Sequence, residues 1–167
     1  MTEKRIIGTK KIQFEGIFSA KELYAVINEP FDTKSYDKYE PLNQEIVKED
    51  GKDIKINLIR EKKFSDYYKA VIEIQILLRK LKDVEVEIDG KRKNMKKGMV
   101  SVEFKEMMFS DYEGKWIQGA WYFLTRTLAD KFFNKKIYSD FLTQLKEDGA
   151  ESHRRAIGYL NFQKNRI

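Results

Sequence analysis

The chain has 167 residues, a length that suits one domain with a substantial core and is too short for two comfortable ones. Charged residues make up 36% of the chain and the formal net charge is +6, which permits contact with nucleic acid or acidic lipid but specifies neither. The absence of Cys excludes a disulfide framework, thiolate chemistry and Cys-based zinc sites.

The first residues and the hydropathy pattern predict an intracellular, cytoplasmic protein. The start, MTEKRIIGTKK, lacks the apolar core of a secretion signal, and no segment approaches the roughly 20 apolar residues of a membrane span. Many Lys and Glu residues without any Cys are typical of proteins from hot environments.

The first regular element is expected to be a strand over residues 11–18, where apolar and polar residues alternate. Ser19 and Glu22 then fit a capping box, in which the serine oxygen accepts from the third helical amide and the glutamate reaches back to the cap amide. This motif predicts a short helix over residues 20–28.

A pair of helices is expected after the first strand. Pro30 favours an end to the first helix, because the residue before proline is disfavoured in helical geometry. Residues 31–41 then hold enough aromatic side chains for a second helical turn, which Pro41 would end.

The sequence pattern from residue 42 to residue 109 predicts an antiparallel meander, because six segments of alternating apolar and polar residues are separated by short turns. Residues 67–81 are open to a helical reading because they contain ILLRKL, but the β-branched run and the alternation favour a strand. The expected strands are 43–48, 53–62, 67–81, 84–89, 92–95 and 99–109.

A long amphipathic helix is expected over residues 114–145, because apolar residues recur there at spacings of four, three and four. This stripe consists of Ile117, Trp121, Leu124 and Leu128. The acidic residues and glycine at 147–149 suggest a break, after which residues 146–167 would add a further helix and a frayed tail to the single domain, residues 1–167.

This order of elements resembles the START-like helix-grip superfamily, from about Lys10 to Phe133. The resemblance implies an α+β fold in which a curved antiparallel seven-stranded sheet, with a helix pair after the first strand, grips a long C-terminal helix. It also implies an internal cavity for an apolar ligand, although members of the superfamily range from lipid carriers to chaperone co-factors.

Two copies of one tetrapeptide, at 64–67 and 109–112, follow expected strands that run in the same direction. The copies should therefore lie at one end of the sheet, joined there by the Asp89–Gly90 turn, and their aromatic residues would surround the mouth of the cavity. The alternative is that Ser and Asp form local side-chain turns while the aromatic residues plug this end. The predicted ligand-binding residues are Phe64, Asp66, Tyr67, Phe109, Asp111, Tyr112, Trp116 and Trp121.

Other constellations favour ordinary structural roles. Five positive charges in residues 91–97 suggest a phosphate-binding hairpin, but acidic residues 85–89 offset them, and a solvated sheet edge is favoured. His153 is expected to be a surface residue. Asp66 and Asp111 are the one pair of carboxylates that the expected strand order brings close together. Both are expected in solvent-exposed turns, where burial would not raise a carboxyl pKa, so acid–base chemistry is disfavoured there. No catalytic residue, metal or cofactor is assigned, and an enzyme is disfavoured.

The sequence therefore favours non-enzymatic binding of a small apolar ligand, lipid-like or aromatic, in a cavity between the sheet and the C-terminal helix. The alternatives are a protein-interaction module with a filled core and a weak binder of nucleic acid or acidic surfaces through residues 91–97. The volume of the side chains on the inner face of the sheet distinguishes the ligand carrier from the interaction module. Most of these side chains are mid-sized, and they leave room that Trp121, Phe123 and Phe104 either fill or leave open.

Overall fold

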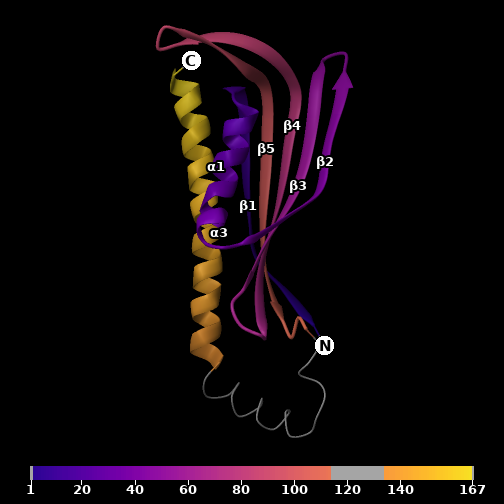
Figure 1. The fold of residues 1–167 in the computed structure, drawn as a ribbon, viewed down its shortest axis with the longest axis vertical. Coiled ribbons are helices and arrows are strands. Elements are labelled where there is room, and N and C mark those ends of the chain that lie inside the picture. The colour runs from indigo at the N-terminus through magenta and orange to yellow at the C-terminus, as the bar shows by residue number, and fades with distance from the viewer. Residues whose placement is uncertain (1, 114–133, 167) are drawn as a thin grey trace, which may run out of the picture.

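The computed structural model describes residues 2–113 and 134–166. It contains one antiparallel sheet of five strands and two helices, the second of them 33 residues long. Figure 1 shows the two helices lying along the same face of the sheet. The elements are β1 (Glu3–Phe18), α1 (Ala20–Thr33), β2 (Asp37–Lys48), β3 (Gly51–Lys63), β4 (Tyr68–Ile88), β5 (Lys91–Ser110) and α3 (Asn134–Arg166).

The strands follow the order β1-β5-β4-β3-β2, so the first strand lies beside the last and the other four form a meander. Every neighbouring pair is antiparallel, as short connections require. The expectation of a continuous meander over residues 42–109 is confirmed, and residues 68–81 belong to a strand rather than a helix.

The sheet has five strands, so the expectation of seven was wrong. Two of the expected turns lie opposite each other inside β4 and β5, where Lys82 pairs with Lys97 and Asp83 pairs with Lys96. The segments that were expected to be turns are therefore parts of β4 and β5, at the point where these two continuous strands bend together. The glycine and the charged residues that resemble turn signals mark this bend, after which both strands continue.

A line of glycines crosses the sheet at the bend. Gly16 of β1 pairs with Gly98 of β5, and β4 beside them has a register shift at Lys80, whose φ is 53°. A Cβ atom on Gly98 would lie 2.7 Å from the carbonyl oxygen of Arg79, and one on Gly51 would lie 2.8 Å from the carbonyl carbon of Lys80. Only glycine lets the neighbouring strands approach this bulge so closely. We call this line, formed by Gly16, Gly51, Gly98 and the bulge at Lys80, the glycine crease.

One helix, not a helix pair, follows β1. The helix α1 continues through Pro30 to Thr33, and β2 begins at Asp37, inside the segment where a second helix was expected. Pro30 removes one backbone hydrogen bond, but the next residue, Phe31, is fully buried and packs edge-on against Tyr36 with ring centroids 5.4 Å apart. Burial of this aromatic ring offsets the lost hydrogen bond and keeps the last turn helical.

The N-terminus of α1 follows the capping prediction in part. The Ser19 side chain accepts a hydrogen bond from the Glu22 backbone N–H at 3.3 Å. The Glu22 carboxylate accepts from the Tyr159 hydroxyl of α3 at 2.9 Å, so its side chain links the two helices.

The helix α3 runs without interruption through residues 147–149, where the sequence suggests a break. Gly149 lies against the Glu106 carboxylate, and a Cβ atom there would be 2.1 Å from Glu106 Oε1. The glycine therefore serves close packing on β5 and does not end the helix. The predicted apolar stripe from Ile117 to Leu128 lies outside the described residues, and so does the expected start of the helix.

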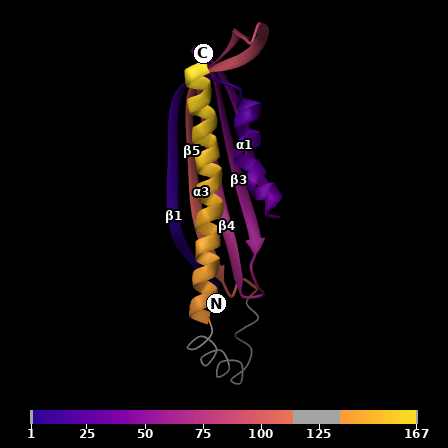
Figure 2. The same cartoon turned by 90° about the vertical axis from the view of Figure 1, so that its left-hand side faces the viewer.

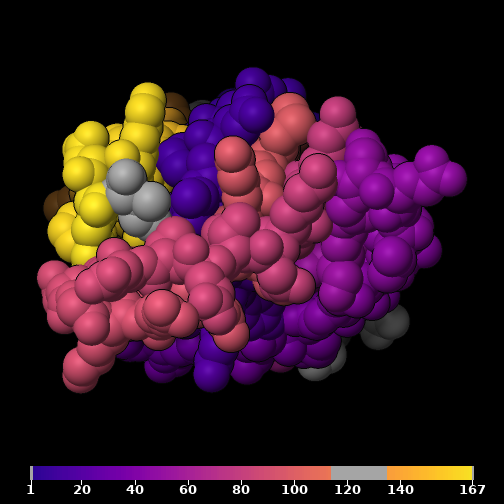
Figure 3. Space-filling model, turned by 90° about the horizontal axis from the view of Figure 1, so that it is seen from above, coloured from indigo at the N-terminus to yellow at the C-terminus, as the bar shows by residue number. Residues whose placement is uncertain are grey.

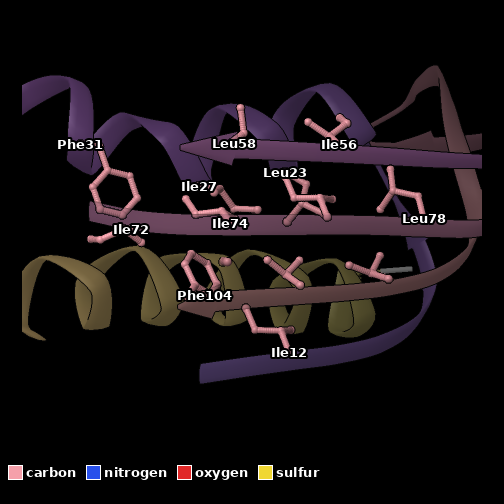
Figure 4. Packing of buried hydrophobic residues seen from close by; sticks show 14 of the residues in the cluster. Ile12, Leu23, Ile27, Phe31, Ile56, Leu58, Ile72, Ile74, Leu78 and Phe104 are labelled. Atoms are coloured by element: carbon pink, nitrogen blue, oxygen red, sulfur yellow. The ribbon is translucent and has the colours of Figure 1, made fainter. Parts of the chain in front are cut away.

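The core lies between the sheet and the two helices (Figures 2 and 4). Leu23, Ile27 and Phe31 of α1 face Leu58 of β3 and the middle of β4. Figure 2 shows α3 beside α1, over β1, β5 and β4. The fully buried hydrophobic side chains of α3 are those of Leu145, Ala156 and Leu160.

Candidate functional site

The structure brings the two copies of the tetrapeptide together at one end of the sheet. The Asp111 backbone N–H donates to the Tyr67 carbonyl oxygen at 2.9 Å, and the Tyr112 hydroxyl donates to the Ser65 carbonyl oxygen at 3.1 Å. They meet because β3 and β5 both run antiparallel to β4 and so end at the same end of the sheet. The Asp89–Gly90 turn lies at the opposite end of the sheet, which corrects the expectation that it joins them there.

The helix side of this end is filled by stacked rings. Phe64 stacks on Phe141 of α3 with centroids 4.8 Å apart, and Tyr68 lies 5.2 Å from Tyr138. The Ser65 hydroxyl oxygen accepts from the Tyr68 backbone N–H at 3.0 Å, which makes a local side-chain turn. These contacts are those expected of an end closed by aromatic residues.

Phe109 and Tyr112 of the second copy lie beside Lys69 on the opposite face of the sheet, whereas Tyr67 of the first copy lies edge-on to Tyr68 with ring centroids 4.8 Å apart. Phe109 pairs in register with Lys69, and the Lys69 ammonium group lies 5.7 Å from the centroid of Phe109 and 5.6 Å from that of Tyr112. Because Phe64 stacks on Phe141 of α3 and Phe109 lies beside Lys69 on the opposite face, these two residues do not line one opening. Trp116 and Trp121 lie outside the described residues.

The two aspartates of the tetrapeptides occupy different surroundings. Asp66 is exposed, whereas Asp111 is 1% exposed and has a φ of 50°. The Asp111 carbonyl oxygen accepts from the Thr2 hydroxyl at 3.0 Å, which ties the start of the chain to this end. One buried and one solvated carboxylate do not form the paired site that the sequence raised.

The inner face of the sheet is packed by its own side chains and those of the helices. Phe104, the one aromatic residue among the three volume candidates that the structure describes, is fully buried and lies edge-on to His153 at 5.9 Å. His153, which was expected to be a surface residue, is partly exposed, with Nε2 3.2 Å from the Lys11 carbonyl oxygen. Figure 4 shows buried side chains of α1, β3, β4 and β5 gathered between the helices and the sheet, where they form one hydrophobic cluster.

A buried polar cluster joins the connection between α1 and β2 to α3. The Tyr36 hydroxyl donates to Asp148 Oδ2 at 2.8 Å, and Lys34 Nζ lies 2.8 Å from Asp148 Oδ1. Burial, followed by the negative charge of Asp148, raises the pKa of Tyr36 far above its ordinary value, so this phenol stays a donor. A depression of about 630 Å³ opens beside Asp148 and is lined by Lys34, Lys146, Glu147, Asp148, Ala150, Glu151 and Arg154.

Two further charged side chains point inward from the sheet. Arg60 is fully buried, donates from Nε to Asn28 Oδ1 at 3.0 Å and pairs with Asp32 at 2.8 Å. Glu106 is 1% exposed and forms an ion pair with Lys10. Both of these buried charges have partners, so the loss of one partner would leave an uncompensated charge at the junction of the helices with the sheet. The sequence signal was available: Arg60 and Glu106 share the alternation of their apolar neighbours.

The opposite face of the sheet is covered by neither α1 nor α3, and we call it the open face. Two shallow depressions, of about 330 and 380 Å³, lie on it. At the centre, the Gln75 amide donates to Asn57 Oδ1 at 3.4 Å, and Lys11 pairs with Glu103 at 3.2 Å. The first depression is lined by Pro41, Asn57, Leu58, Ile59, Glu73, Ile74, Gln75, Glu103 and Lys105, the second by Gln13, Phe14, Glu15, Leu77, Arg79, Met99, Val100 and Ser101.

Several large apolar side chains are exposed on the open face. Register places Met99 opposite Arg79 and Ile6 opposite Met107, and it places Tyr39 and Ile46 on the same side of β2. Their exposed fractions range from 42% for Met99 to 56% for Ile6. Sequence reasoning missed this surface because alternation identifies the outward residues of a strand without showing whether anything covers them.

The basic hairpin is a solvated edge rather than a pure cation surface. Lys96 forms an ion pair with Asp83 across the two strands, and Arg92 lies in register with Glu87. Its acidic neighbours therefore offset much of its charge, as the favoured interpretation expects.

Two kinds of feature are absent from residues 2–113 and 134–166. No three His, Asp or Glu side chains in these ranges are grouped to hold a metal ion. No helix in them has the length and apolar character needed to cross a membrane. Neither a scan against protein-family models nor a search of curated proteins finds a match for this chain, so the resemblance to the START-like superfamily stays a prediction.

Proposed function

We propose that this protein is a non-enzymatic protein-interaction module with a filled core. The observation that carries the proposal is the packing of the inner face, where Phe104, Phe31 and Ile74 are each at most 1% exposed between the sheet and the helices. A carrier needs a cavity of some 300 Å³ or more inside the fold. The side chains between β4 and the two helices occupy the position that such a ligand would take.

The open face is the surface that we propose for the partner. It combines exposed apolar side chains, such as Met99 and Tyr39, with central amides from Asn57 and Gln75 that offer both donors and acceptors. Protein interfaces of the transient kind have this mixed composition. Because Lys11 and Lys69 of this face already pair with Glu103 and Glu61, binding should depend weakly on salt.

A photo-crosslinking residue placed at Gln75 in the cells that make the protein tests this proposal. We expect a defined protein adduct from Gln75, and none from the same group at Lys136, an exposed position on α3. Equal adducts from both positions, or none from Gln75, would contradict the open face as the docking surface.

The apolar-ligand carrier is the competing function. It predicts that a small molecule remains bound when the purified protein is weighed by native mass spectrometry. The interaction module predicts the mass of the chain alone. A retained, saturable small molecule would overturn the filled-core proposal whatever the crosslinking result.

A further inference from the structure

Beyond the glycine crease, β4 and β5 continue as a ribbon of only two strands. The strand β1 ends at Phe18, opposite Lys96, and β3 begins at Gly51, near Leu81. Residues 84–95 therefore pair only with each other. Figure 1 shows this ribbon bending over the C-terminal end of α3, and Figure 3 shows it from above, lying beside the last residues of the helix. We call residues 82–97 the strap.

The strap has one exposed face and one covered face. Glu85 and Glu87 are exposed, whereas Ile88 and Met95 are each only 5% exposed. Neither apolar residue belongs to the main core cluster between the helices and the sheet. A two-stranded hairpin is marginal by itself in water, so the strap depends on what its covered face packs against.

Within the described residues, an ion pair joins the tip of the strap to the helix. Asp89, in the turn between the two strands, pairs with Arg166 in the last turn of α3. The Asp89 side chain is 83% exposed and that of Arg166 is 28% exposed, so water and salt reach the pair. Nearby, Gln163 Oε1 is the one buried side-chain polar atom in the described ranges without a hydrogen-bond partner.

We propose that the strap is a hinged element that closes over the C-terminal end of α3, with the glycine crease as its hinge and the Asp89–Arg166 pair as its latch. The crease supplies the hinge because the bulge at Lys80, where φ is positive, lies against Gly51 and Gly98, two residues that have no side chain of their own. Opening exposes Ile88 and Met95, which gives the protein a second, concealed apolar surface besides the open face.

Distances between paired spin labels test the hinge directly, and the lack of native Cys makes the labelling unambiguous. One label replaces Lys91 at the tip of the strap and the other replaces Lys146 on α3. We expect two distance populations, with the longer one increased about twofold by Arg166→Ala and by about 0.5 M NaCl. A reference pair at Lys55 and Lys146, both below the crease, should give one narrow population under every condition.

The matched control removes other exposed ion pairs of the same helix. Arg155 pairs with Glu29 and Glu151, away from the strap, so Arg155→Ala should leave the strap distances unchanged. The double variant Asp89→Arg with Arg166→Asp restores the latch with reversed charges and should return the populations to those of the wild type. A single narrow distance that neither Arg166→Ala nor salt moves would overturn the proposal, and so would an equal response to Arg155→Ala.

Discussion

The two halves of β4 have almost the same alternation of apolar and polar residues, yet they lie in different surroundings. Below the glycine crease, Ile72, Ile74 and Ile76 are at most 2% exposed, because α1 and α3 cover them and strands flank them on both sides. Above it, Val84 and Val86 are only half-buried, in a ribbon of two strands. Alternation thus reports that a segment is a strand, while neighbours in space decide whether its apolar residues belong to a core.

The largest expected effect on stability comes from truncating a buried side chain in the covered half of β4, compared with the same kind of truncation in the strap. Ile74→Ala should lower the free energy of unfolding by about 2–5 kcal/mol, because it leaves a cavity in a fully packed region. Val86→Ala should cost about 1 kcal/mol or less, since the side chain is half exposed. Denaturant melts measure both, and equal losses would mean that the strap is as well packed as the core.

Two glycines of α3 give the next contrast. Gly149→Ala places a methyl group where the Glu106 carboxylate lies, and we expect a loss of about 1–3 kcal/mol from the resulting displacement. A Cβ atom on Gly158 meets nothing within 4 Å, so Gly158→Ala should stabilise the helix by up to about 1 kcal/mol. Thermal melts should give a lower melting temperature for Gly149→Ala and a higher one for Gly158→Ala. A higher melting temperature for both variants would show that the Glu106 carboxylate does not need the close approach of Gly149.

The sequence predicted where the chain is extended and where α1 begins. It did not predict the bend in β4 and β5 or the continuation of α1 through Pro30, and each of these errors has a specific cause. Gly98 and its lysines have the composition of a turn, and only the pairing of β5 with β1 and β4 shows that they form a bend. Pro30 indicated a helix end, but the burial of Phe31 overrides that local preference. Local rules describe one strand or one turn at a time, whereas both features depend on contacts between distant segments.

The candidate site shows the same limit. The two tetrapeptides were expected at one end of the sheet, and they lie there, but their aromatic side chains divide between its faces. The assignment of Phe64, Asp66, Tyr67, Phe109, Asp111 and Tyr112 to a ligand remains a prediction. The inward charges were overlooked because Arg60 follows the last residue of an apolar row and Glu106 interrupts one. Alternation alone does not distinguish an inward charge from the end of a buried segment.

Alkaline pH should weaken the junction of α1 with α3. Tyr36 has a pKa raised in the folded state above its ordinary value of 10.0, so its contribution to stability is complete below that value and is lost as the pH rises through it. From pH 10 upward the wild type should lose up to about 1.4 kcal/mol per pH unit from this group. Tyr159, whose pKa burial also raises, adds a contribution of the same sign.

The variant Tyr36→Phe isolates that contribution. It should be less stable near pH 8 by about 1–3 kcal/mol, because Asp148 loses a buried donor, and its stability should fall less steeply above pH 10. Denaturant melts from pH 8 to 11 measure the two slopes. Parallel slopes for variant and wild type would show that the Tyr36 phenol is not held protonated by the fold.

The smallest expected effect lies on the outside of the strap. Lys93 is exposed, so Lys93→Ala should change the free energy of unfolding by about 0.5 kcal/mol or less. A larger loss in a denaturant melt would place Lys93 in a contact that holds the strap closed.

Titration of the native protein with an apolar fluorescent probe tests the filled core most directly. With Phe104, Phe31 and the isoleucines of β4 closing the space between sheet and helices, we predict no saturable binding and no increase in the free energy of unfolding at high probe concentration. Binding of one probe per chain that stabilises the fold, and that survives Met99→Arg on the open face, would contradict the filled core and favour the apolar-ligand carrier.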